Sequence, residues 1–233
     1  MIIGFCGQAG SGKDTSADFL VKNDLFVKVA FADPLKRICQ EVYDFTDDQL
    51  WGPSSSRNAP DLRYPRVKFE NYPFMSPQDA ADIVGPGTPA YLTPRYALQQ
   101  LGTEWGRNCF DNTWVDYALR IHDRLQKGDC YYDTKSGLRF TTSMVSWATP
   151  KKDVVISDVR FKNEIDAIKK AGGLVIKLLR GEGLEGAAGQ HKSETELQGI
   201  PLESFDFILD NREWTLDQLE SRLHNLVQLE LKK

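Results

Sequence analysis

The hydrophobic positions of the chain follow two different periods, and each change of period predicts a new element. Residues 1–6 form a short apolar run that is ended by glycines, which is typical of a buried strand. Residues 13–22 carry apolar side chains at helical spacing, and the alternating, β-branched residues 26–31 predict a second strand. The chain is therefore expected to begin with a strand, a helix and a strand.

A helix is expected directly after the second strand. Asp33 is placed as its N-cap and Pro34 as its first helical residue. One apolar stripe should face the core from this helix, made of Leu35, Ile38, Cys39 and Val42.

The middle of the chain loses this regularity. Seven prolines fall within residues 46–92, and Pro94 follows just after them. No long periodic run is found there, so we expect an irregular insertion and not an independent domain. A helix should restart at Thr93-Pro94, run through Leu101 and stop at Gly102.

A longer helix is expected over residues 112–127, followed by Gly128, and the aromatic and Thr-rich residues 130–142 suggest a β-hairpin. One face of that helix is apolar and consists of Trp114, Ala118, Ile121 and Leu125.

The last third alternates strictly between element types. Strands are expected at residues 153–158, 174–180 and 206–211, and a helix at residues 163–171. A Gly-rich span covers residues 181–199. The last helix carries an apolar stripe that could serve the core or a homodimer, formed by Leu216, Leu219, Leu223 and Leu226.

Five strands joined through helices predict an α/β fold with a mainly parallel sheet and right-handed crossovers, in a single domain over residues 1–233. Ligands of such sheets bind beyond the carboxyl ends of the strands. Functional residues should therefore follow Cys6, Phe31, Ile156, Leu179 and Leu209.

Composition narrows the classes of function. The chain has 233 residues, of which 41% are hydrophobic and 27% charged, as in ordinary globular proteins. A net charge of −4 gives no general reason to bind nucleic acid or an anionic membrane. The four cysteines are scattered without a C-x-x-C pair, which fits a reducing cytoplasm. We therefore expect a cytoplasmic protein without a signal peptide or membrane span, acting on small molecules.

The stretch GFCGQAGSGKDTSADFL contains the spacing Gly7-x4-Gly12-Lys13 between the first predicted strand and a helix. In that context the pattern predicts a P-loop, whose backbone N–H groups and lysine bind the phosphates of a nucleotide. Asp14 stands where a Ser or Thr usually binds Mg²⁺, so it either holds a water on the metal or only favours the helix dipole. The candidate nucleotide-binding residues of the loop are Gly7, Ala9, Gly10, Ser11, Gly12, Lys13, Asp14 and Thr15.

The loop GxxxxGKDT resembles that of phage deoxynucleoside monophosphate kinases, which are related to animal phosphomevalonate kinases. Three further stretches are similar to the phage family in the same order, FADPLK, RYALQQLGTEWGRNCFDNTWV and VVISDVRFKNEIDAI, as is the ending FDFILDN. The resemblance implies a three-layer P-loop NTPase fold of the nucleoside monophosphate kinase type, with an inserted acceptor-binding region and a lid over residues 181–199. It also implies ATP and Mg²⁺ as cofactors, a deoxynucleoside monophosphate (dNMP) as acceptor, and the host cytoplasm if a phage encodes the chain.

The end of the third long strand supplies further candidates. Asp158 lies where a Walker-B-type aspartate would orient a magnesium-bound water, so the expected metal site consists of Asp14, Thr15 and Asp158. Arg160 and Arg180 are expected to neutralise charge on the transferred group. Glu164 is expected on a helix face, paired with Lys162 or Lys169, and Asp210-Asn211 should lie beside the adenine.

The acceptor phosphate needs cations of its own. Arg95 begins a helix and could bind that phosphate bidentately, while Gln99 or Gln100 could hydrogen-bond a base edge. By resemblance, Gly102-Thr103 closes the same segment. Residues that follow the second strand are placed on the acceptor side as well, namely Asp33, Lys36 and Arg37.

Three other readings stay open beside a dNMP kinase. One is a kinase of another small phosphate ester, such as phosphomevalonate. A second is an NTP-hydrolysing or NTP-sensing switch, which would leave Arg95, Lys36 and Gln99 without a role. A nucleic-acid-binding module is disfavoured by the acidic balance and by the lack of an aromatic-basic stripe.

Overall fold

The computed structural model describes residues 1–8, 10–22, 26–66, 76, 79, 90–128, 152–180, 196–197 and 199–230. These residues form two compact units. The first unit, here called the loop unit, holds residues 1–31, 112–128 and the described residues from 152 onward; the second, the helical unit, holds residues 32–111. The expectation of one domain over all 233 residues stays a prediction.

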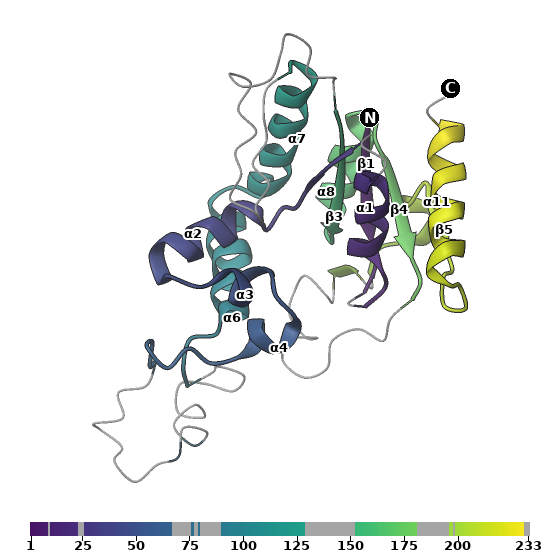
Figure 1. The fold of residues 1–233 in the computed structure, drawn as a ribbon. Helices are drawn as coiled ribbons and strands as arrows, with labels where there is room; N and C mark the ends of the chain where they lie inside the picture. The colour runs from purple at the N-terminus through teal and green to yellow at the C-terminus, as the bar shows by residue number, and fades with distance from the viewer. Residues whose placement is uncertain are drawn as a thin grey trace. The chain divides into compact units, whose positions relative to one another are not determined.

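The loop unit is built around a sheet of five parallel strands in the order β2-β3-β1-β4-β5 (Figure 1). The sheet confirms the predicted mainly parallel α/β architecture. Its strands are β1 (Ile2–Cys6), β2 (Phe26–Val29), β3 (Asp153–Val159), β4 (Leu174–Leu178) and β5 (Phe207–Leu209).

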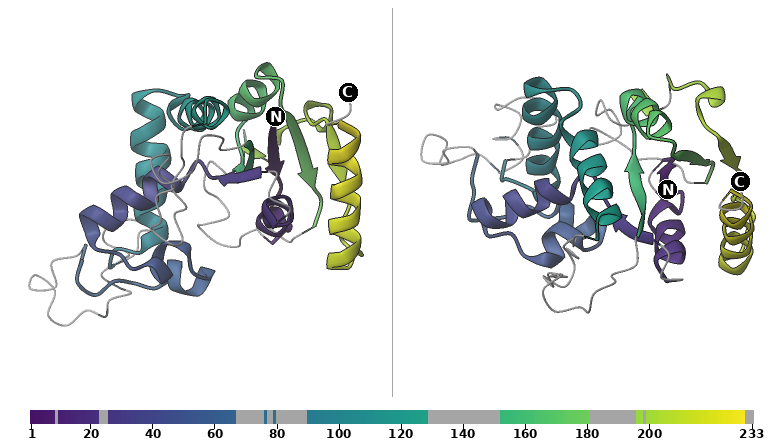
Figure 2. Two further views of the ribbon diagram at one scale, coloured as in Figure 1. Left: turned by 45° about the horizontal axis from the view of Figure 1, so that its top comes forward. Right: turned by 90° about the horizontal axis from the view of Figure 1, so that it is seen from above.

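Helices cover both faces of this sheet (Figure 2). On one face lie α1 (Lys13–Lys22) and α11 (Leu216–Glu230), and on the other α8 (Lys162–Lys170), with α7 (Thr113–Gln126) beside it. The α1 and α11 side chains share one apolar core with Ile3 and Phe5 of β1, because alternate residues of a buried strand face opposite layers.

Gly4 shows why the second face is equally close-packed. A Cβ atom at this position would lie 2.9 Å from Cδ1 of Ile168 on α8, so a larger residue would have to displace the Ile168 side chain. The leucine stripe of α11 packs mainly on the sheet, since Leu219 and Leu223 are buried, while Leu216 is 58% exposed. A homodimer through this helix stays a prediction.

Most predicted elements of the loop unit are confirmed, with ends within two residues of those observed. Gly128 follows α7 with φ of 82°, and the predicted apolar face of α7 is buried. A short 3₁₀ helix, η4 (Leu202–Ser204), precedes β5. Among the described helices, none is long and apolar enough to cross a membrane.

The helical unit is an assembly of short helices. They are α2 (Asp33–Tyr43), α3 (Asp47–Trp51), α4 (Ser54–Asn58), α6 (Pro94–Gln99) and the π-helix η2 (Gln100–Arg107). An isolated antiparallel bridge joins Pro65 to Tyr91. Residues 46–66 contain the two short helices α3 and α4, while residues 67–75, 77–78 and 80–89 lie outside the described part. The expectation of an irregular insertion over residues 46–92 stays a prediction.

The start of α2 differs from the prediction. Ala32 is the N-cap, so Asp33 is already the first helical residue, and no side chain caps the helix. The predicted apolar stripe is wrong as well. Leu35 and Cys39 are buried, but Ile38 and Val42 are 37% and 64% exposed, because only part of this face meets the core of the helical unit.

Gly102 does not end the helix that begins at Pro94. The chain continues from α6 directly into η2, and Gly102 lies inside that π-helix. A Cβ atom on Gly102 would lie 3.1 Å from Cδ1 of Leu35, tighter than most such contacts. The glycine therefore permits close packing on α2 and does not terminate a helix.

A polar network around Asp61 holds the helical unit together. Asp61 is 7% exposed and accepts hydrogen bonds from the Arg63 guanidinium at 2.7 and 2.9 Å and from Nε2 of Gln49 at 3.0 Å. The hydrogen bonds from Arg63 are the main cause that lowers the pKa of Asp61 to about 2. The same guanidinium reaches Asp44 and the carbonyl of Tyr43 at the end of α2.

Candidate active site

The loop between β1 and α1 has the backbone of a phosphate cradle. Gly10 and Gly12 have φ of 78° and 93°, values that favour glycine. At Gly7 a Cβ atom would lie 2.7 Å from the carbonyl oxygen of Leu178, so β1 and β4 leave no room for a side chain there. The N–H of Ser16 donates to the carbonyl of Gly12, which begins α1 with its free N–H groups beside the loop.

Lys13 points its ammonium group back into this loop. Its Nζ donates to the carbonyl oxygens of Gly7 at 2.7 Å and Gln8 at 2.6 Å. Burial, and then the charge of Arg160, lower the pKa of Lys13 to about 8. A phosphate oxygen placed at the loop would offer the buried ammonium the negative partner that would raise this pKa again.

Four of the candidate side chains come together here. Asp14, Asp158 and Arg160 all lie close enough for their charges to act on Lys13. Lys13 and Asp14 begin α1. Asp158 lies in β3, the strand that pairs with β1, and Arg160 directly follows this strand. Parallel pairing thus unites residues more than 140 positions apart in the sequence.

Asp14 has two partners that were not predicted. Its Oδ1 accepts a hydrogen bond from the Ser157 hydroxyl at 3.0 Å and forms an ion pair with Lys28 of β2 at 2.9 Å. Partial desolvation of the carboxylate would raise its pKa. The ion pair with Lys28 and the hydrogen bond from Ser157 outweigh this effect and hold the pKa of Asp14 below its usual value. Asp14 therefore joins α1 to β2 and β3, and its role at the metal or the helix dipole stays a prediction.

Asp158 and Arg160 are positioned by backbone contacts. The N–H of Phe31, just after β2, donates to Oδ1 of Asp158 at 2.9 Å. Glu164 is 2% exposed and accepts from the N–H groups of Arg160 at 2.7 Å and Phe161 at 3.0 Å. The predicted pairing of Glu164 with Lys162 or Lys169 is therefore wrong: the carboxylate caps the start of α8, where it satisfies free N–H groups.

The two lysines expected beside Glu164 have other acidic partners. Lys162 pairs with Asp166 at 2.8 Å, and Lys169 pairs with Asp206 at 3.1 Å. Both lysines are on the solvent side of α8, whereas Glu164 is buried beneath its first turn.

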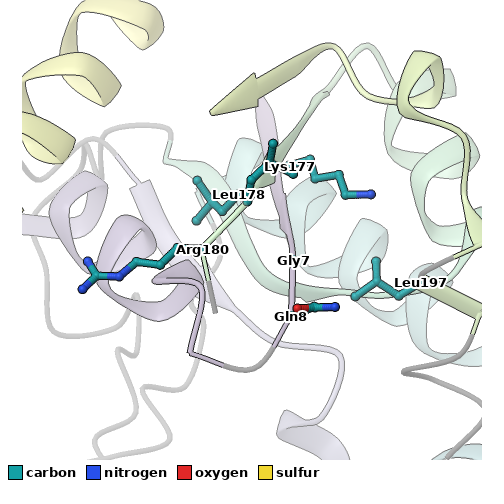
Figure 3. A pocket seen from close by; sticks show the side chains of 7 residues that line it. Gly7, Gln8, Lys177, Leu178, Arg180 and Leu197 are labelled. Atoms are coloured by element: carbon teal, nitrogen blue, oxygen red, sulfur yellow. The ribbon is translucent and has the colours of Figure 1, made fainter. Parts of the chain in front are cut away.

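A cavity of about 290 Å³ opens beyond the carboxyl ends of β1 and β4 (Figure 3). Gly7, Gln8, Leu197 and the end of β4 line it. Lys177 of β4 extends on the side of Leu197. Arg180 is exposed, lies two residues after β4 and extends in the opposite direction. Lys177 also lies 4.7 Å from the ring centre of Phe205, so its charge is held in place by a cation–π contact.

The predicted adenine residues behave differently from each other. Asn211 is 1% exposed, and its Nδ2 donates to the carbonyl of Ser11 at 3.0 Å, which attaches the end of β5 to the phosphate loop. Asp210 is exposed and pairs with Arg212. Ala9 lies outside the described residues, as do the hairpin at 130–142 and residues 181–195 and 198 of the lid.

The predicted acceptor residues all belong to the helical unit. Arg95 is in the first turn of α6, as expected, and its Nε donates to Oδ1 of Asn58 at 2.5 Å. Lys36 lies 5.4 Å from the ring centre of Trp51. Gln99 ends α6, and η2 contains the other three candidates of this segment, Gln100, Gly102 and Thr103. Asp33 and Arg37 are in α2.

Two polar positions of the sheet were missed by reading the sequence, Ser157 and Lys28. Each is a polar residue directly next to apolar residues of a strand, and this is the signal that could have found them. In the helical unit, Arg66 was missed; its guanidinium lies 4.1 Å above the ring of Tyr96 and donates to the Tyr96 hydroxyl at 3.0 Å.

Two of the three described cysteines, Cys6 and Cys39, are buried, and Cys109 is exposed. Cys6, Cys39 and Cys109 are free thiols. Burial raises the pKa of both Cys6 and Cys39 to about 12, so neither would form a thiolate nucleophile at neutral pH.

Comparison with known proteins finds relatives over the whole length. A putative deoxynucleotide monophosphate kinase of Acanthamoeba polyphaga mimivirus is 32% identical over 232 residues, covering 97% of this chain and 96% of the relative. The deoxynucleoside-5′-monophosphate kinase of Escherichia phage T5 is 24% identical, covering 99% and 97%. The deoxynucleotide monophosphate kinase of Enterobacteria phage T4 is 22% identical, covering 98% and 99%.

Other comparisons add little. No family model matches the chain. Among solved structures, the shikimate kinase of Bacteroides thetaiotaomicron matches 98% of both chains at 11% identity and a TM-score of 0.35, a likeness too weak to carry an argument.

Proposed function

The chain belongs to the family of deoxynucleoside monophosphate kinases, and we propose that it transfers the γ-phosphoryl group of ATP to a dNMP, giving dNDP and ADP. The observation that carries this proposal is the buried Lys13 ammonium inside the glycine loop, with Asp14, Asp158 and Arg160 around it. Phosphoryl transfer needs positioning and charge compensation, and these groups supply both.

In the proposed reaction the loop binds the phosphates of ATP. The N–H groups at the start of α1 face the β- and γ-phosphates, and Lys13 exchanges its two carbonyl partners for phosphate oxygens. Its charge then follows the phosphoryl group from donor to acceptor. Asn211 keeps the loop attached to the end of β5, which supports a contact of residues 210–211 with the adenine.

Mg²⁺ would be held by Asp14, Thr15 and Asp158 and would neutralise charge on the phosphates. The donor set fits this ion, because it consists of carboxylate and hydroxyl oxygens on α1, which follows the loop, and on β3, which pairs with β1. The described residues contain no group of three acidic, His or Cys side chains that could hold a metal. Mg²⁺ usually takes only one or two carboxylates and completes its shell with phosphates and water.

Two arginines are proposed to neutralise the charge that develops on the transferred group. Arg160 is held beside Lys13 through its own backbone N–H, which donates to Glu164. Arg180 lies at the mouth of the cavity next to Gly7 and Gln8, where a lid over the following residues would carry it toward ATP.

The acceptor is proposed to bind the helical unit. Arg95 contacts the 5′-phosphate, with Lys36 and Arg37 as further cations, and Gln99 or Gln100 reads the base. Asp33, Gly102 and Thr103 complete the acceptor segment. The contact of Arg95 with Asn58 supports this role, because it holds the guanidinium in one orientation and thereby lowers the cost of binding a phosphate bidentately.

One assay separates the proposed function from its alternatives. ADP release is measured with ATP and Mg²⁺ against each dNMP, each NMP, phosphomevalonate and no acceptor. We expect release only with certain dNMPs, which would also identify the accepted bases. Stimulation by phosphomevalonate would instead assign another phosphate ester, and equal ADP release without acceptor would make the protein an NTPase.

A further inference from the structure

P-loop NTPases usually hold Mg²⁺ with two groups from two elements: the hydroxyl of the Ser or Thr that follows the loop lysine, and a carboxylate at the end of a neighbouring strand. Here the residue after Lys13 is Asp14, a carboxylate, and the residue of β3 that contacts it is Ser157, a hydroxyl. A hydroxyl and a carboxylate therefore meet here as well, with the carboxylate on α1 and the hydroxyl on β3, next to the Asp158 carboxylate.

Ser157, and not Asp158, reaches α1. Val155 belongs to the core that α1 and α11 form on one face of the sheet, and the Ser157 hydroxyl, two positions further on, contacts Asp14 on the same face. The register of β3 against β1 shifts between Ile156 and Val159. Asp158 lies within this irregular stretch and accepts the N–H of Phe31, just after β2.

The contact between Ser157 and Asp14 is a charge-assisted hydrogen bond. Ser157 is 3% exposed, and its hydroxyl donates to an ionised carboxylate at 3.0 Å. Lys28 binds the same oxygen, Oδ1, at 2.9 Å. With Oδ1 held by both partners, the Asp14 side chain is still 78% exposed, so the carboxylate is oriented without being covered.

We propose that Ser157 is a positioning residue that orients the Asp14 carboxylate toward the Mg²⁺ of the bound nucleotide. The proposal rests on the proposed function of the loop. A partner that fixes a metal-binding carboxylate typically changes metal affinity when it is removed, although it does not touch the metal.

The test measures how much Mg²⁺ increases the affinity of the protein for ADP. ADP is titrated into the wild-type protein and Ser157→Ala by calorimetry, with Mg²⁺ and with EDTA, and the ratio of the two affinities is the magnesium-dependent gain. We expect Ser157→Ala to reduce this gain by about 10-fold and to leave the affinity for ADP in EDTA unchanged. The concentration of Mg²⁺ needed for half-maximal turnover should rise by a similar factor.

Two matched controls separate this effect from general damage. Ser16→Ala removes another fully buried hydroxyl of the loop unit, one without a hydrogen-bond partner among the described residues. Asp18→Asn removes the second carboxylate that binds Lys28, at 3.0 Å, and leaves the pair of Ser157 and Asp14 intact. Both should keep the magnesium-dependent gain of the wild type.

A double-mutant cycle then tests whether Ser157 acts through Asp14. Asp14→Ala should lower the gain more than Ser157→Ala does, and Ser157→Ala should cost nothing further in the Asp14→Ala background. A full, additive cost in that background, or a Ser157→Ala variant that matches Ser16→Ala, would overturn the proposal. Because calorimetry with ADP needs no acceptor, it decides the role of Ser157 even if no dNMP stimulates turnover and the proposed function fails.

Discussion

The two units of the molecule place their candidate residues by different means. In the loop unit, the parallel strands bring the ends of distant segments to one edge of a sheet, so Lys13, Asp14, Asp158 and Arg160 meet through backbone pairing. The helical unit has no strand among its described residues beyond a single bridge, and side-chain contacts position its cations. Arg95 donates a hydrogen bond to Asn58, and the Lys36 ammonium lies over the ring of Trp51.

This difference indicates how each unit should respond to mutation. A sheet with a closed apolar core on both faces tolerates the loss of one functional side chain without losing its geometry. The helical unit has a smaller buried cluster, made of Cys39, Phe45, Leu50 and Ala97, and relies on the polar network of Asp61. Changes in the loop unit should therefore affect mainly turnover, and changes around Asp61 mainly stability.

The largest effect is expected for Lys13→Ala. The substitution removes a full charge from the transition state, so kcat should fall by about 100-fold or more while the fold is retained. Steady-state ADP release with the best dNMP measures this, and circular dichroism checks the fold. Lys22→Ala, which changes a 72% exposed lysine at the end of α1, is the matched control and should have wild-type turnover. A folded Lys13→Ala protein with near-normal kcat would refute the loop assignment.

Asp61→Ala should give the largest loss of stability in the helical unit. It removes a buried carboxylate and leaves Arg63 and Gln49 without their acceptor, which should cost about 2 kcal/mol of unfolding free energy. Urea unfolding measures this value. Asp44→Asn removes the charge of the other carboxylate of Arg63, which is 95% exposed, keeps a residue type that tolerates the φ of 48° at this position, and should cost less than about 0.5 kcal/mol. Equal losses in the two variants would show that burial of the network is unimportant.

The same network predicts a pH dependence of stability. The pKa of Asp61 is lowered from 3.8 to about 2 on folding, so its ionised form stabilises the protein above the unfolded value. This contribution should disappear as the pH falls from about 4 toward 2. Unfolding free energies of the wild type and Asp61→Asn should thus converge over that interval. Curves that stay parallel down to about pH 2 would contradict the assignment.

Arg95→Ala tests whether the helical unit binds the acceptor. Loss of the bidentate phosphate contact should raise the KM for the dNMP by about 10-fold and change kcat much less. Arg120→Ala, an exposed arginine of α7 in the loop unit, serves as the control. An unchanged KM for the dNMP would contradict the assignment of Arg95 to the acceptor phosphate. It would not affect the assignment of the P-loop to ATP.

The same contrast explains what could be predicted from the sequence. The strands and helices of the loop unit follow from periodicity, because each buries one regular face, and the P-loop follows from its spacing. Ser157 and Lys28 could not be assigned to Asp14, since their approach depends on strand register and side-chain direction. Glu164 was paired wrongly because a sequence does not reveal that a carboxylate turns back onto backbone N–H groups.

The errors in the helical unit have one physical origin. Its short helices bury little surface each, so neither the exposed half of the α2 stripe nor the continuation through Gly102 could be recognised from local pattern. In both cases packing between neighbouring helices decided the outcome, as the contact of Gly102 with Leu35 illustrates.

The smallest expected effect compares two equivalent helix caps, one in each unit. Thr46 and Gln49 exchange hydrogen bonds at the start of α3, and Thr215 and Gln218 do so at the start of α11. Removing either threonine should cost about 1 kcal/mol of unfolding free energy. Gln49, however, also donates to Asp61.

Thr46→Ala should therefore be non-additive with Asp61→Ala, because each loosens the same glutamine, whereas Thr215→Ala should add its full cost to Asp61→Ala. Urea unfolding of the single and double variants measures both couplings. If Thr46→Ala and Asp61→Ala are additive to within about 0.3 kcal/mol, the cap and the network are independent. The helical unit would then be held by separate local contacts, and its difference from the loop unit would lie in core size alone.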